Sequence, residues 1–202
     1  KGFLGSFLWE ELKKNKKINL IGLDINIYSN NRKYSDSYHK INFFFFNKID
    51  VIIHLAGVST NYDPKGSIYR RISHKVNYLD TASFVKEAKK AGVKKFIFAS
   101  STSVYGNKNN KLVKEDSKLS PTTSYGRAKA NAEKKLVKMS SKNFKIIILR
   151  MVTLFGVSKR MRFDLLVNNL VASYFKNKKI DFSSDGKKIR PQIHIKDVSE
   201  VY

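Results

Sequence analysis

The stretch "SYGRAK", residues 124–129, places Tyr125 four positions before Lys129. On a helix this spacing puts both side chains on one face, where the ammonium group can lower the pKa of the phenol. A phenol that has lost its proton is a general base, and moving a tyrosine pKa from ~10 toward neutrality requires roughly 4 kcal/mol of differential stabilisation. The pair therefore predicts proton transfer. Tyr174 and Lys178 have the same spacing, so spacing alone does not identify the site.

The surroundings separate the two pairs. Residues 123–139 predict a helix whose inward stripe consists of Tyr125, Ala128, Lys129, Ala132 and Leu136. Lys178 instead lies in "FKNKK", where solvent is the expected environment. Upstream of the first pair, "FIFASSTSVYG" predicts a buried strand that ends in hydroxyl residues, at the sheet edge where open α/β folds bind ligands. Ser101 lies there and could hold the oxygen of a substrate.

A second group of residues indicates a dinucleotide. Gly2 and Gly5 begin an amphipathic helical pattern, and a glycine turn of this kind lets backbone amides approach a pyrophosphate at a helix N-terminus. The alternative for the glycines is a tight turn with close helix packing. Asp24 follows Gly5 by nineteen positions, at the end of the predicted strand "INLIGLDI". A carboxylate there can accept hydrogen bonds from ribose hydroxyls and favours NAD over its 2′-phosphorylated relative, whereas the alternative is a helix cap or turn.

Strand and helix patterns alternate along the chain. Further strands are predicted in "DVIIHLAG", "KKFIFASS" and "FKIIILR", and a helix in "NYLDTASFVKEAKKAG" is closed by Gly92. The run "FFFF" at 43–46 predicts another buried strand. This alternation predicts an α/β fold, a Rossmann-type doubly wound parallel sheet. Gly2 and Gly5 correspond to only the last two glycines of a three-glycine phosphate turn, so the sheet is expected to lack its first strand. Residues 1–155 are expected to form the NAD-binding domain and residues 156–202 the start of a small substrate-binding lobe.

Composition limits the class of protein. With 202 residues and 42% hydrophobic side chains the chain can bury a real core. No apolar run reaches the ~20 residues of a membrane span and no signal pattern is present, so we expect a cytoplasmic protein without membrane contact. The chain has no cysteine, and its four histidines never approach metal-binding spacing, so no metal is expected.

The formal net charge of +24 raises the possibility of a nucleic-acid partner. The lysines are spread over the whole chain, mostly on the polar sides of helical patterns, and no helix-turn-helix, zinc-finger or aromatic RNA-binding motif accompanies them. We therefore expect a solvated basic surface and no specific nucleic-acid site. Attraction to anionic sugar phosphates is compatible with it.

The motifs follow one another in this order: "GFLGS", Asp24, "DVIIHLAG", "VNYLDT", "FIFASSTSVYG", "SPTTSYGRAKANAE", "LRMVTLFGVS" and "RPQIHIKDV". In this order they resemble the motifs of an extended short-chain dehydrogenase/reductase of the NAD-dependent epimerase/dehydratase group. This resemblance spans nearly the whole chain. The stretch "VSKRMRFDLLVNNLV" and the later "SDG…RP" are similar to the branch of nucleoside-diphosphate-sugar epimerases. It implies that Tyr125 is the catalytic base and acid, that Lys129 holds the nicotinamide ribose and that Ser101 binds the reacting sugar oxygen.

The resemblance also implies the binding residues. The cofactor would be lined by Gly2, Phe3, Leu4, Gly5, Asp24, Leu55, Ala56, Gly57, Asn77, Ser100, Tyr125 and Lys129. Substrate would be bound by Ser101, Thr153, Asn169 and Arg190, with Arg190 gripping the diphosphate; the alternative for Arg190 is an exposed surface arginine. A homodimer is expected for the full-length protein.

Two departures from the family pattern bear on function. The family usually has an adenine-contacting aspartate where this chain has "NFFFFNKID". Dehydratases of the family place Thr-Asp-Glu where this chain has Ser101, Thr102 and Ser103, so the resemblance disfavours dehydration.

The sequence thus predicts an NAD-dependent nucleotide-sugar epimerase that works through a transient keto sugar. A net ketosugar reductase or dehydrogenase of the same fold and a non-catalytic, RNA-binding relative are the alternatives. The first strand of such a fold is central, so we also expect residues 1–202 alone to be poorly stable and to bind NAD weakly, and ~10 upstream residues to restore binding.

Overall fold

The structure is a computed structural model that describes residues 2–24, 48–59, 68–108, 112–180, 185 and 189–202. Residues Asp36–Met151 form one compact unit, here called the central unit, and Lys1–Ser35 with Val152–Tyr202 form the other, the flanking unit. The run at 43–46, for which the sequence predicts a strand, lies outside the described residues. No helix within them is both long and apolar enough to cross a membrane.

In the part of the chain that the structure describes, a three-stranded parallel sheet forms the centre of the central unit. Its strands are β1 (Val51–His54), β2 (Lys95–Ser101) and β3 (Lys145–Met151), in the order β1-β2-β3. In the middle strand, Phe98 is in register with His54 of β1 and Ile148 of β3. Parallel neighbours need a crossover connection, which here contains helices. The predicted α/β class with a parallel sheet is confirmed, as are these three strands.

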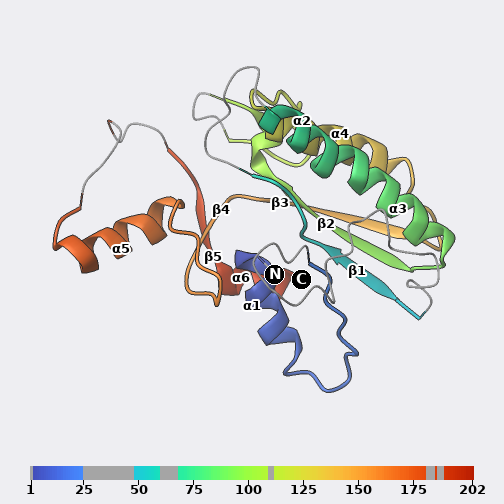
Figure 1. The fold of residues 1–202 in the computed structure, drawn as a ribbon. Helices are drawn as coiled ribbons and strands as arrows, with labels where there is room; N and C mark the ends of the chain where they lie inside the picture. The colour runs from blue at the N-terminus through green and yellow to red at the C-terminus, as the bar shows by residue number, and fades with distance from the viewer. Residues whose placement is uncertain (1, 25–47, 60–67, 109–111, 181–184, 186–188) are drawn as a thin grey trace. The chain divides into compact units, whose positions relative to one another are not determined.

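Helices of the central unit cover one face of this sheet (Figure 1). They are α2 (Ile68–His74), the π-helical turn η4 (Lys75–Asp80), α3 (Thr81–Lys90) and α4 (Ser124–Val137). After α3, Gly92 adopts a φ of +83° and its N–H bonds to the Lys89 carbonyl, which is the helix end that the sequence predicts. Thr123 caps α4 by accepting a hydrogen bond from the Gly126 N–H at 3.0 Å.

The core lies between this helical layer and the sheet. Its buried members are Val85, Ala88, Val93, Phe96, Phe98, Ala132, Leu136 and Phe144. Phe96 and Phe98 are two positions apart on β2, so their side chains point to the same face of the sheet, toward the helices. Both are fully buried. Burying each of these side chains contributes roughly 1.5–3 kcal/mol, which fixes β2 against α4.

One predicted strand is wrong. The described part of "INLIGLDI", residues 18–24, has no strand conformation, and Ile18, Ile21 and Leu23 are about half exposed. A strand persists only where its backbone groups pair with a neighbour, and no strand in the described ranges pairs with this segment. An apolar run without such a neighbour gives no strand, whatever its propensity.

The described residues of the flanking unit form three helices and a small sheet. They are α1 (Phe3–Leu12), α5 (Leu166–Asn177) and α6 (Ile195–Val201), with the parallel pair β4 (Thr153–Phe155) and β5 (Gln192–His194). α1 packs against α6. The second Tyr/Lys pair lies here: Tyr174 is 49% exposed, and Lys178 follows α5 in the left-handed conformation. That pair is on the surface, as its sequence context predicts.

Candidate active site

Lys129 is the centre of the candidate site. Its side chain is 2% exposed, and its Nζ donates a hydrogen bond to the Ala99 carbonyl of β2 at 2.8 Å. The Nζ also lies 4.5 Å from the centre of the Phe98 ring and 5.8 Å from that of Tyr125. Burial lowers the pKa of Lys129 to about 7, against the opposing attraction of the Glu133 carboxylate. The predicted inward face of α4 is therefore confirmed, and its lysine is in an environment that changes its chemistry.

His54 is a buried histidine close to Phe98, and no motif in the sequence indicated it. His54 ends β1, and its ring centre is 5.5 Å from those of Phe84 and Phe96 and 6.0 Å from that of Phe98. Its Nε2 lies 3.1 Å from the Thr81 hydroxyl, whose own proton goes to the Val76 carbonyl, so Nε2 is the donor. Burial, with repulsion from Lys129, lowers the His54 pKa to about 3. The floor of the site is thus aromatic and uncharged near neutral pH.

Asn77 and Gly57 form a cradle beside Lys129. Asn77 is fully buried, and its amide bonds to both backbone groups of Val58, accepting from N–H at 2.9 Å and donating to C=O at 2.8 Å. It also donates to the Ser73 hydroxyl at 3.0 Å. A Cβ on Gly57 would lie 2.8 Å from the Asn77 Oδ1 and 3.4 Å from the Lys129 Nζ. A side chain at position 57 would therefore fill the space in front of the lysine.

The hydroxyl residues lie where β2 ends, as predicted. Ser101 is the last residue of β2, is half-buried and accepts a hydrogen bond from the Ser103 N–H at 3.2 Å. A 3-10 turn, η5 (Thr102–Tyr105), follows it. Gly126 in the first turn of α4 packs close to η5, since a Cβ there would lie 2.7 Å from the Ser103 carbonyl oxygen. This close contact brings the start of α4, with Tyr125, to the end of β2.

Ser100 points elsewhere. Its side chain is 2% exposed and its hydroxyl donates a short hydrogen bond to Glu133. Leu55, Ala56 and Gly57 form the loop directly after β1, and Ala56 and Gly57 are exposed. Of the residues predicted from the sequence, the structure thus gathers one group in the central unit, at the carboxyl ends of β1 and β2: Leu55, Ala56, Gly57, Asn77, Ser100, Ser101, Tyr125 and Lys129.

The remaining predicted residues belong to the flanking unit. Gly2 precedes α1 in an extended conformation, its carbonyl accepts from the Ser6 N–H at 2.8 Å, and Phe3, Leu4 and Gly5 form the first turn of α1. Phe3 is buried, and its carbonyl accepts a hydrogen bond from Ser158 at 2.7 Å. Among the described residues, no atom lies within 4 Å of a Cβ added at Gly2, so packing against them does not require glycine there. Asp24 is half-buried.

The predicted substrate residues of this unit differ in exposure. Thr153 begins β4 and is half-buried, while Asn169 is exposed on α5 and donates to the Phe163 carbonyl at 2.9 Å. Arg190 is exposed. The buried asparagine is the neighbouring Asn168, which accepts from the Gly156 N–H at 3.1 Å and donates to the Arg162 carbonyl at 3.1 Å.

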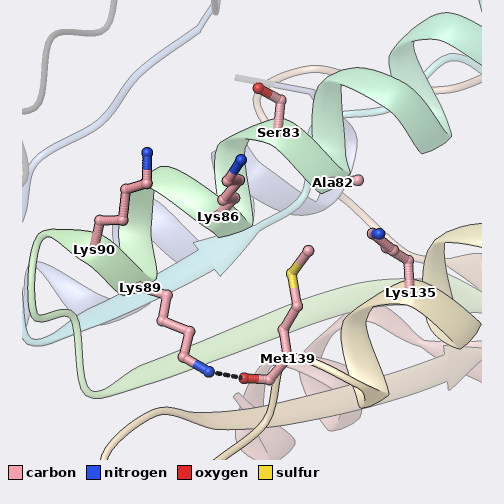
Figure 2. A pocket seen from close by; sticks show the side chains of 7 residues that line it. All are labelled: Ala82, Ser83, Lys86, Lys89, Lys90, Lys135 and Met139. Atoms are coloured by element: carbon pink, nitrogen blue, oxygen red, sulfur yellow. Dashed lines mark hydrogen bonds between the residues drawn. The ribbon is translucent and has the colours of Figure 1, made fainter.

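A groove of about 760 Å³ on α3 and α4 collects part of the positive charge (Figure 2). It is lined by Ala82, Ser83, Lys86, Lys89, Lys90, Lys135 and Met139. Lys89 donates to the Met139 carbonyl at 2.7 Å, and Lys90 pairs with Glu87 at 3.1 Å. None of the candidate site residues lines this groove, so it is separate from the site around Lys129.

Comparison with known proteins assigns the family. The model of the NAD dependent epimerase/dehydratase family matches residues 1–202. The chain belongs to this family. It is 31% identical to the uncharacterized UDP-glucose epimerase YtcB of Bacillus subtilis (strain 168), over 97% of this chain and 67% of that protein. It is 29% identical to a dTDP-D-glucose 4,6-dehydratase of Dictyostelium discoideum, over 100% of this chain and 52% of that protein.

Among solved structures, the chain is similar to the UDP-glucuronic acid 4-epimerase of Bacillus cereus in complex with UDP-glucuronic acid and NAD. The TM-score is 0.83 and the sequence identity 25%, over 98% of this chain and 68% of that one. The family predicted from the motif order, and with it the Rossmann-type fold, is confirmed. The chain spans about two thirds of these two Bacillus proteins and about half of the slime-mould dehydratase.

Proposed function

We propose that the protein is an NAD-dependent nucleotide-sugar epimerase that acts through a transient keto sugar. The observation that carries this proposal is the position of Lys129: a buried amine between the Gly57/Asn77 cradle and Tyr125, at the carboxyl end of a parallel sheet. Ligands of open α/β folds bind at that edge. The family relatives support the same class of reaction, since they include UDP-sugar epimerases and dehydratases.

The residues of the central unit fit a dinucleotide. Gly57 leaves open the space that a Cβ would fill in front of Lys129, and Asn77 holds the loop after β1 through both backbone groups of Val58. A glycine at this point of the loop lets a flat ring and its ribose approach the lysine closely. NAD bound there would supply reversible hydride transfer: the hydride leaves one face of the sugar carbon and returns to the other face of the same carbon.

The chain's own residues handle the proton. Tyr125 would take the proton of the sugar hydroxyl and give it back, because the ammonium of Lys129 favours the phenolate form. Ser101 would hold the same sugar oxygen by a hydrogen bond and keep it near the phenol. The aromatic floor of Phe98 and neutral His54 excludes water from one side of the lysine, which strengthens its electrostatic effect on Tyr125.

Epimerisation is favoured over dehydration by the residues after Ser101. Elimination of water needs an acid and a base on the sugar beyond the tyrosine, and Thr102 and Ser103 supply hydroxyl groups in place of carboxyl groups. Three further statements remain predictions from the sequence. They are that Thr153, Asn169 and Arg190 bind the substrate, that the protein is a homodimer and that it is cytoplasmic.

The test is to supply the complete protein with NAD and a panel of nucleotide sugars and to follow the products by NMR. We expect interconversion of two epimers with no net change in NADH absorbance. A net change in that absorbance supports a reductase or dehydrogenase. Absence of turnover with every sugar, together with salt-sensitive RNA binding, would replace the enzyme proposal with a binding protein.

A further inference from the structure

Beyond Lys129, α4 presents a third inward ionisable group that the proposed reaction does not use. Glu133 lies one turn after Lys129 and is 3% exposed. Its carboxylate accepts a hydrogen bond from the Ser100 hydroxyl and three from Arg150. Two of these come from the Arg150 Nε at 3.1 Å and one from its Nη2 at 2.8 Å. A buried carboxylate is costly unless it is paired and hydrogen-bonded in this way.

Arg150 connects Glu133 to both sides of Ser101. In the sheet, Arg150 of β3 is in register with Ser100, the residue before Ser101. Its Nη1 donates to the Tyr105 hydroxyl at 2.8 Å, at the end of the turn that follows Ser101, and to the Glu115 carbonyl at 2.7 Å. The hydrogen bonds to Glu133 raise the pKa of Arg150 further above its usual value, so the guanidinium stays charged at every pH at which the protein is folded and assayed.

Two neighbouring residues of β2 are thus tied to two successive turns of α4. The Ala99 carbonyl accepts from Lys129, and the Ser100 hydroxyl donates to Glu133. Ser101 follows these anchors directly, and Tyr125 precedes Lys129 by one turn. The anchors therefore set the register between the serine and the tyrosine of the candidate site.

We propose that Glu133 and Arg150 are positioning residues that hold Ser101 in register with Tyr125 and Lys129, and that the Glu133 carboxylate favours the ammonium form of the Lys129 side chain. This inference rests on the proposed function for its kinetic consequences. The electrostatic effect does not depend on the proposed function, because Glu133 lies one turn from Lys129 on the same buried face of α4 and acts on it whether or not a sugar is turned over.

The decisive variant of the complete protein is Glu133→Gln, which keeps the shape and an acceptor for Ser100 but removes the charge. Without the carboxylate, Lys129 loses its proton at lower pH, so the alkaline limb of kcat/KM should move to lower pH by about one pH unit. The pH at which NAD affinity declines should move in the same direction. We expect kcat to fall by about 10–100-fold, with KM for the sugar changed less than about threefold.

Arg150→Lys separates position from charge. It keeps the cation beside Glu133 but loses the forked geometry, so kcat should fall about 10-fold while the alkaline limb stays in place. Glu87→Gln, in the exposed pair with Lys90 on α3, is the matched control and should leave both profiles unchanged.

A Glu133→Gln protein whose pH profiles superimpose on the parent's, with only the melting temperature lowered, would overturn the inference in favour of a structural ion pair. If that variant does not fold, Arg150→Lys and Ser100→Ala decide, and unchanged kcat in both overturns the positioning role. A parent that turns over no nucleotide sugar refutes the proposed function instead. The NAD titrations against pH still test the action of Glu133 on Lys129 in that case.

Discussion

The ammonium nitrogen of Lys129 lies 5.8 Å from the centre of the Tyr125 ring, one turn away on α4. The first prediction follows from this relationship. In the complete protein, Tyr125→Phe should lower kcat by about 10²–10⁴-fold while NAD affinity stays nearly unchanged, because the phenol acts on the proton and the ring is retained. Lys129→Met should damage both turnover and NAD binding. Steady-state kinetics and calorimetry measure the two effects.

Tyr174→Phe is the control for this prediction, since Tyr174 has the same spacing to a lysine but is 49% exposed on α5. Turnover of Tyr125→Phe within a factor of two of the parent contradicts the assignment, and so does a larger loss from Tyr174→Phe.

The buried lysine should also lower the stability of the fold. The Lys129 pKa is about 7 in the folded protein, below its usual value of 10.5, so between these values the unfolded chain binds more protons and stability rises with pH. The free-energy cost of burying the Lys129 ammonium group is fully present below pH 7. Lys129→Met removes it, at the smaller cost of leaving the Ala99 carbonyl without its donor.

We therefore expect Lys129→Met to unfold at higher urea concentration than the parent at pH 7, and this advantage to shrink toward pH 9.5. Lys135→Met, an exposed lysine of the same helix, should show no such dependence on pH. A Lys129→Met protein that is less stable than the parent at pH 7 would mean that the amine is better solvated than its burial indicates.

Cofactor choice gives the third prediction. Asp24 would repel a 2′-phosphate, and no arginine follows it directly, so the complete protein should bind NAD more tightly than NADP. Asp24→Ala should narrow the gap between the two affinities. Isothermal titration of both dinucleotides is the measurement, and equal affinities in the parent would remove Asp24 from the site.

Much of the central unit follows from local sequence patterns. The strands at β1, β2 and β3, the glycine end of α3 and the inward position of Lys129 are each specified by a few neighbouring residues. The segment at 18–24 has a similar apolar pattern but forms no strand, because pairing depends on a distant partner that local residues do not encode.

The ionic network behind the site was missed for the same reason. Glu133 and Arg150 are 17 residues apart, and each alone is an ordinary charged residue at the sequence level. What brings them together as a partly buried ion pair is the parallel register that places Arg150 beside Ser100. The spacing of Glu133 four residues after Lys129 was the available signal, since it continues the inward stripe of α4.

The last prediction concerns the cradle in front of Lys129. A Cβ on Gly57 would lie 2.8 Å from the Asn77 Oδ1, and Asn77 cannot easily yield because its amide is bonded to Val58 and Ser73. Gly57→Ala should therefore weaken NAD binding about 10-fold and lower the melting temperature. Gly2→Ala adds a Cβ that meets no atom of the described part of the chain within 4 Å, so it should leave the melting temperature unchanged.

The contact between these two residues can be isolated by a double-mutant cycle. Asn77→Ala alone frees the Val58 backbone groups and should be destabilising, but it also removes the oxygen that the new methyl group would strike. Gly57→Ala should therefore cost less stability in the Asn77→Ala background than in the parent, with a coupling of about 0.5–3 kcal/mol in urea unfolding. Strict additivity would mean that the loop after β1 moves away from Asn77 without strain, and the shape of the cradle would then not depend on glycine at position 57.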